Sequence, residues 1–155
     1  MSDHIIFSII LIFLFLLIFL IKKYRLWKIK DEARLHTLVK QIAASNRMQL
    51  SITDHFRKKT LGFDLVKHKV LYVDLKNNII RIVDMEDIDN CRLIKKQLSI
   101  QMELIYQDQD KAPLTITFFN KFSDHKWRRN KLEKKARYWE VLMNGILNKN
   151  LHARA

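Results

Sequence analysis

The hydrophobic and polar positions follow three different rhythms along this chain. Ile5 to Ile21 is seventeen residues long, and sixteen of them are Ile, Leu or Phe, with Ser8 as the exception. Between about residues 31 and 46 the apolar positions recur at helical spacing, and from about residue 50 they alternate with polar positions in short runs. The pattern therefore predicts an apolar helix, an amphipathic helix and an antiparallel sheet, in that order.

The first run predicts a transmembrane helix over residues 5–27. Seventeen residues rise about 25 Å, and continuing the helix through Tyr24 and Trp27 supplies the rest of a hydrocarbon core of about 30 Å. We expect those two aromatic residues to be interfacial anchors, because Tyr and Trp favour the headgroup level. A buried core helix is one alternative. A cleaved signal peptide is another, but small residues of an Ala-x-Ala type are missing before "KKYR".

Five cations follow the apolar run directly: Lys22, Lys23, Arg25, Lys28 and Lys30. Residues 1–4 carry only the terminal amine and Asp3. The positive-inside rule then predicts a single-pass protein of the inner (cytoplasmic) membrane, with residues 1–4 outside and everything after the helix in the cytosol. The five cations are predicted to dock on anionic phospholipid headgroups of the lipid bilayer.

Residues 28–48 form the second predicted element, a juxtamembrane amphipathic helix. Its apolar stripe consists of Leu35, Leu38, Val39 and Ile42. The stripe is expected to pack against the domain that follows. A dimer seam is the alternative, but the stripe covers fewer than three heptads.

Short β-branched and aromatic runs, separated by turn-like segments, make up most of the remaining chain. Strands are predicted at residues 61–66, 70–73, 79–83, 91–96, 99–107 and 114–119. Because the connections are only about three to seven residues long, too short for parallel crossovers, the sheet should be an antiparallel meander. A C-terminal helix follows, with Leu132, Ala136, Trp139 and Met143 on one face. We therefore expect an α+β domain over residues 51–150 and a tail at 151–155.

The order of these elements resembles bacterial PH-like domains of the pleckstrin-homology superfold. The resemblance rests on the hairpins "LGFDLVKHKVLYVD" and "IIRIVDMEDIDNCRLIKK" and on the helix that carries Trp139, and it runs from about Ser51 to Leu147. It implies a β-barrel of six or seven strands capped by the C-terminal helix. Membrane-anchored bacterial copies of this pattern look similar to the whole chain.

The resemblance also implies a binding or scaffold module rather than an enzyme, because PH-like domains dock on acidic lipids or on proteins. Its basic cluster maps onto Arg57, Lys58, Lys59, Lys67, Lys69 and Arg81. The loop at Lys67–Lys69 is too short to wrap an inositol phosphate, so diffuse electrostatic docking on anionic lipid is the expected mode. A protein–protein adaptor that regulates another membrane protein, or a homo-oligomer, is the alternative.

Charge and cysteine content agree with a cytosolic binding module. The chain has 29 Lys and Arg against 16 Asp and Glu, a formal net charge of +13. Such an excess favours anionic partners, although a solvated basic surface would give the same balance. The single Cys91 cannot form an internal disulfide and is expected to be an inert core thiol.

Catalytic and metal-binding signatures are missing from the sequence. None of the six His has a second His or Cys at metal-ligand spacing, and two Gly are too few for a phosphate-binding loop. We expect no cofactor, no metal and no enzymatic activity. The segment from Lys121 to Trp139 mixes cations with Trp127, which keeps membrane-tethered nucleic-acid binding as the least favoured hypothesis.

Overall fold

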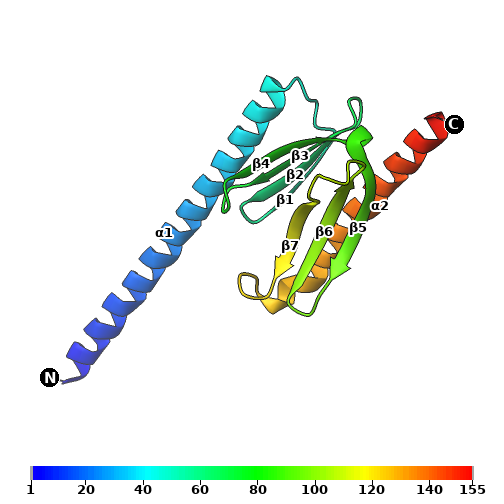
Figure 1. The fold of residues 1–155 in the computed structure, drawn as a ribbon. Helices are drawn as coiled ribbons and strands as arrows, with labels where there is room; N and C mark the ends of the chain where they lie inside the picture. Colours follow the sequence, from blue (N-terminus) through cyan, green and yellow to red (C-terminus); the bar gives the residue numbers. More distant parts are fainter. Residues whose placement is uncertain (1, 155) are drawn as a thin grey trace. The chain divides into compact units, whose positions relative to one another are not determined.

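The computed structural model describes the backbone of residues 2–154 and the side chains of Phe7, of residues 11–26 and of residues 30–149. The chain divides into two compact units, Met1–Gln41 and Ile42–Ala155. The second unit contains both β-sheets and the C-terminal helix (Figure 1).

One continuous helix, α1 (Ser2–Ser45), runs through both helices that the sequence predicts, at residues 5–27 and 28–48. It ends in a Schellman-type arrangement, with Arg47 in the left-handed region at φ 53°. The amide of Met48 donates to the carbonyl of Ala43 at 2.8 Å, and the amide of Arg47 donates to Ala44 at 3.0 Å. These bonds satisfy carbonyls of the last turn, so the helix stops without a glycine.

The transmembrane prediction is contradicted. In the described residues, no helix is apolar over a long enough stretch to cross a membrane. The side chains of the predicted span at 5, 6, 8–10 and 27 lie outside the described residues. The single-pass topology and the inner-membrane location were inferred from that span and are corrected with it.

The first sheet of the second unit is an antiparallel meander in the order β1-β2-β3-β4. Its strands are β1 (Ile52–Phe56), β2 (Lys59–Asp64), β3 (Lys69–Asp74) and β4 (Ile79–Asp84). An aspartate ends each of the last three strands, at a spacing of ten residues. The carboxylate of Asp64 accepts from the amides of Val66 and Lys67, each at 2.9 Å, and Asp74 caps the next turn in the same way. The repeated aspartate thus sets where each hairpin turns.

The second sheet, in the order β5-β6-β7, follows a short 3-10 helix, η1 (Met85–Asp87). It consists of β5 (Ile88–Lys95), β6 (Ser99–Tyr106) and β7 (Leu114–Asn120). The described chain therefore has two separate antiparallel sheets, and the predicted single barrel is wrong. The α+β composition, the antiparallel pairing and the C-terminal helix agree with the sequence analysis.

The C-terminal helix α2 (Arg129–Arg154) follows a 3-10 turn, η2 (Lys126–Arg128), and runs along the second sheet (Figure 1). Its buried face contains Leu132, Ala136, Trp139, Met143 and Leu147. The helix also closes the outer edge of β5. The amide of Leu93 donates to Glu140 at 2.8 Å, and Asn144 bonds both backbone groups of Cys91. Because those edge groups are satisfied, β5 cannot pair with another strand at these positions.

Candidate docking surface

The predicted cations of α1 whose side chains the structure describes all lie at the surface. Lys22, Lys23, Arg25 and Lys30 are exposed, and so is Tyr24, at 66%. The side chains of Trp27 and Lys28 lie outside the described residues. Contact of this group with lipid headgroups stays a prediction, and the interfacial role given to the two aromatics depended on a transmembrane helix that is contradicted.

The six predicted cations of the domain do not form one cluster. Arg57, Lys58 and Lys59 lie at the β1–β2 turn, whereas the turn at Lys67–Lys69 joins β2 to β3. Consecutive turns of an antiparallel meander lie at opposite ends of the sheet, so the two groups are separated by the length of β2. Arg81 lies within β4, level with Tyr72 of β3.

At least three of these six cations are paired with carboxylates. Arg57 Nε lies 2.6 Å from Asp124, Lys59 Nζ 3.3 Å from Asp74, and Lys69 Nζ 3.4 Å from Asp84. A cation whose charge is already neutralised offers less to an external anion than its place in the sequence indicates. Binding of an anion by these residues stays a prediction.

Lys59 of β2, which is paired with the buried Asp74 of β3 in the first sheet, links that sheet to the second one. The ammonium of Lys59 also donates to the carbonyl of Thr117 on β7, at 3.0 Å. Burial alone would raise the pKa of Asp74, but Lys59 and the hydrogen bonds from Asn77 outweigh it, so the pKa lies below its ordinary value. Burial and the neighbouring Asp74 carboxylate raise the pKa of Tyr72, whose hydroxyl donates to that carboxylate at 3.3 Å. Lys59, Tyr72 and Asp74 therefore form a buried polar network in the first sheet, and Lys59 connects this network to β7.

Arg57 and Asp124 form a second link, between the β1–β2 turn and the segment that leads from β7 to α2. Arg57 has a positive φ of 60°, and the Asp124 side chain is only 4% exposed. Asp124 also accepts from the amide of Asn120 at 2.8 Å, and its own amide donates to the Asn120 carbonyl at 2.7 Å. The segment after β7 is therefore a turn held by its own hydrogen bonds and by the ion pair with Arg57.

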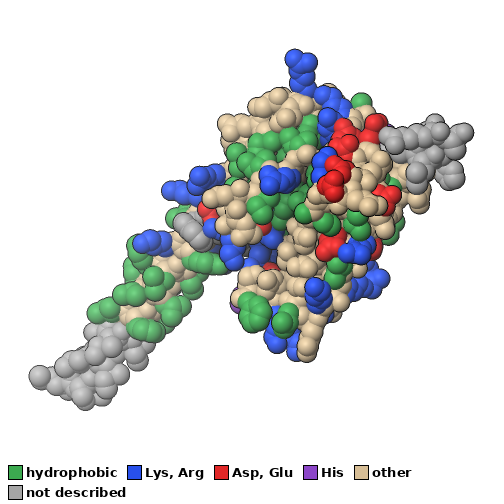
Figure 2. All heavy atoms as spheres, in the orientation of Figure 1, with side chains coloured by type: hydrophobic (Ala, Val, Ile, Leu, Met, Phe, Trp, Pro, Cys, Tyr) green, Lys and Arg blue, Asp and Glu red, His purple; other side chains and the backbone are tan. Residues whose placement is uncertain are grey.

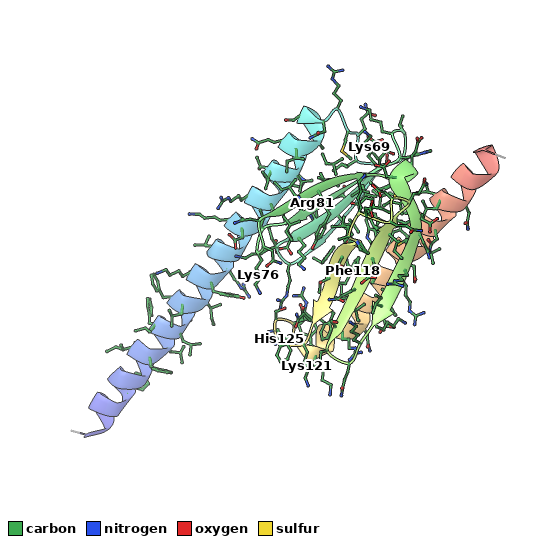
Figure 3. All side chains as sticks on the ribbon, viewed as in Figure 1. Lys69, Lys76, Arg81, Phe118, Lys121 and His125 are labelled. Carbon is green, nitrogen blue, oxygen red and sulfur yellow. The ribbon has the colours of Figure 1, made fainter. Side chains whose placement is uncertain are left out.

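The structure brings together two basic segments that the sequence analysis did not connect. We call the surface that they form the basic tip: Lys96–Leu98, in the β5–β6 turn, and Lys121–Arg129. The two parts are joined by the amide of Lys121, which donates to the Leu98 carbonyl at 2.8 Å. Figure 2 shows hydrophobic atoms beside Lys and Arg atoms at this end of the second unit, and Figure 3 labels Lys121 and His125 there.

Large apolar side chains point into solvent from the basic tip. Phe122 is 84% exposed, Trp127 is 77% exposed and Leu98 is 41% exposed. They contrast with Phe118 and Phe119, which are buried near the end of β7. A cluster of exposed aromatics on a stable turn is a common sign of an interaction surface.

The charge of the basic tip is strongly positive. Lys96, Lys121 and Lys126 are exposed, and Arg128 lies 5.7 Å from the centre of the Trp127 ring. Arg129 donates to the carbonyls of Gln97 and Lys96 at 3.1 and 3.3 Å and thereby holds the two parts of the tip together. The sequence of the tip contains one acidic residue, Asp124, and that carboxylate is paired with Arg57.

The sequence held a partial signal for this surface. Trp127 was already a candidate for exposure, because it falls outside the apolar stripe of the C-terminal helix. Phe122 was missed because it closely follows the alternating strand "LTITFF", where an aromatic residue reads as part of the core. Only the end of β7 at Asn120 shows that Phe122 has left the sheet.

Among the residues whose side chains are described, no group of three His, Cys, Asp or Glu is arranged to hold a metal ion. Cys91 is buried, and burial, together with the nearby Glu140, raises the pKa of its thiol to about 12. Such a thiol is protonated at neutral pH and is a poor nucleophile.

Comparisons of the chain with protein families, with curated proteins and with solved structures found no match.

Proposed function

We propose that this chain is a non-enzymatic binding module whose basic tip docks on an anionic lipid surface. The observation that carries the proposal is the set of exposed cations beside Phe122 and Trp127, with the nearest carboxylate already paired. Docking of this kind is peripheral and needs no transmembrane helix. The order of elements, seven antiparallel strands followed by a helix, also supports the resemblance to PH-like binding modules.

The cations give the attraction its range and its size. A Lys or Arg near an anionic surface contributes on the order of 1 kcal/mol. Lys96, Lys121 and Lys126 together should then contribute about 3 kcal/mol, or roughly a 150-fold change in affinity. Because screening by salt acts over about 8 to 10 Å, the same contribution should fall as salt is added.

The test compares two variants of the full chain that lose the same charge. The tip variant carries Lys96→Gln, Lys121→Gln and Lys126→Gln. The control variant carries Lys76→Gln, Lys134→Gln and Lys149→Gln, which are exposed and lie outside the tip. Binding is measured on vesicles that contain phosphatidylglycerol and on vesicles of phosphatidylcholine alone.

The quantity to compare is the ratio of binding on anionic vesicles to binding on neutral vesicles. The ratio is needed because α1 exposes apolar side chains such as Phe13 and Phe15, which can adhere to either kind of vesicle. We expect the tip variant to lose most of the ratio and the control variant to keep most of it. An equal loss in both variants would refute the proposal, and so would tip-dependent binding of single-stranded RNA or DNA without any preference for anionic lipid.

A further inference from the structure

Phe122 is held in solvent by a hydrogen-bonded turn. Its amide donates to the Asn120 side chain at 3.0 Å, and the next two amides, of Ser123 and Asp124, donate to the Asn120 carbonyl. The Asp124 carboxylate accepts from the Asn120 amide and forms an ion pair with Arg57. The aromatic ring is therefore presented outward by a well-connected backbone, at 84% exposure.

Trp127 is presented from the neighbouring turn. It lies in η2, where the amide of Arg128 donates to the carbonyl of His125 at 2.9 Å. The Arg128 guanidinium, 5.7 Å from the ring centre, keeps a cation next to the indole. Trp is the side chain that most favours the boundary between headgroups and acyl chains, because one part of it is apolar and the other is polar.

Resting on the proposed function, we infer that Phe122 and Trp127 are an insertion wedge. When the tip docks, the two rings enter the boundary between headgroups and acyl chains, while Lys121 and Lys126 stay at the level of the phosphates. The cations supply attraction at a distance, and the rings supply apolar contact that salt does not screen.

The charges of the tip favour lipid over a second copy of the chain. In a symmetric dimer, the same patch on both copies would come together, which would bring Lys121 and Lys126 against their own equivalents. The only acidic residue of the tip, Asp124, has a side chain that is 4% exposed and paired with Arg57, so it cannot offset that repulsion. An anionic surface with an apolar layer beneath it complements both features of the tip.

The wedge is tested in the full chain by quenching of Trp127 with lipids brominated on their acyl chains. The background is Trp27→Phe, and the Trp127 signal is the difference between this chain and the same chain with Trp127→Phe as well. Trp139, which is fully buried, contributes equally to both. We expect anionic vesicles to shift the Trp127 emission to shorter wavelength and bromine to quench it.

A second measurement uses Phe122→Ala, with Val141→Ala as the control. Val141 is 71% exposed on α2, away from the tip, so both variants remove an exposed apolar side chain. Phe122→Ala should weaken binding to anionic vesicles about tenfold at low and at high salt, and Val141→Ala should change it less than about twofold. Both variants should unfold at the temperature of the parent chain.

The outcomes separate the wedge from the proposed function. If the binding ratio still depends on the tip lysines but bromine does not quench Trp127, the insertion is refuted and peripheral docking stands. If binding does not depend on the tip lysines, the proposed function itself fails. Equal effects of Phe122→Ala and Val141→Ala would also refute the wedge.

Discussion

Replacement of Asp74 by alanine should be among the most damaging single changes to the second unit. The residue is 1% exposed, and its carboxylate accepts from Asn77 Nδ2 at 2.7 Å and from the amides of Lys76 and Asn77 at 3.0 and 3.2 Å. It also faces the Lys59 ammonium at 3.3 Å. Asp74→Ala removes all of these contacts at once and leaves a largely buried cation without its carboxylate.

The expected size follows from that loss. Removing one partner of a buried ion pair costs about 3 to 5 kcal/mol, because the other charge stays buried without compensation. In a chain of this size, a loss of that order lowers the melting temperature by roughly 10 °C. Asp74→Asn keeps the volume but loses the charge, so it should cost less, about 1.5 to 3 kcal/mol.

The assay is urea unfolding followed by near-ultraviolet circular dichroism, because fully buried Trp139 reports the packing of the second unit. Asp108→Ala is the control, since Asp108 is paired with Lys111 at the exposed β6–β7 turn, at 3.7 Å. It should cost less than about 0.5 kcal/mol. A loss below about 1 kcal/mol for Asp74→Ala would refute the reasoning that the buried contacts of Asp74 stabilise the second unit.

Three further predictions concern stability and reactivity. Burial opposes ionisation of Asp64 and Asp74, but backbone amides and, for Asp74, Lys59 lower both pKa values below the ordinary one. Their stabilisation is therefore complete above about pH 4 and is lost as the pH falls through the lowered values; urea unfolding near pH 7 and pH 3 measures it, and equal stability would contradict it. Cys91, whose pKa is raised to about 12, should react with iodoacetamide only on unfolding; fast labelling of the native chain would contradict this. Asn144→Ala should cost about 1 to 3 kcal/mol, because both backbone groups of Cys91 lose their partner; hydrogen exchange at the Cys91 amide should then accelerate, and unchanged protection would contradict it.

The second sheet was largely readable from the sequence because buried and more exposed positions alternate along β6 and along most of β7. The alternation in Ser99–Tyr106 and in Leu114–Asn120 placed β6 and β7 to within a residue at either end. β1 was missed because Asp54 and His55 make "ITDHF" look like a polar loop. In the structure Asp54 joins β1 to α2, because it accepts from Trp139 Nε1 at 3.4 Å and forms an ion pair with Lys135.

Contacts between residues distant in sequence could not be read in advance. Because β1 was not predicted, the sequence did not show that Arg57 and Lys58 form the β1–β2 turn. That turn and the β2–β3 turn at Lys67–Lys69 lie at opposite ends of the sheet, so the predicted anion site combined residues that are far apart. Local composition also cannot show that Arg57 is neutralised by Asp124, sixty-seven positions later. The basic tip depends on the same kind of contact, because Leu98 and Lys121 become neighbours only when β6 and β7 pair.

The most direct test of the account is the salt dependence of binding to anionic vesicles, measured for the parent chain, the tip variant and the control variant. The account predicts that added salt weakens the parent and the control alike, while the tip variant starts weaker and responds much less. A tip variant that binds as tightly as the parent at low salt, and loses affinity with salt to the same extent, would contradict it.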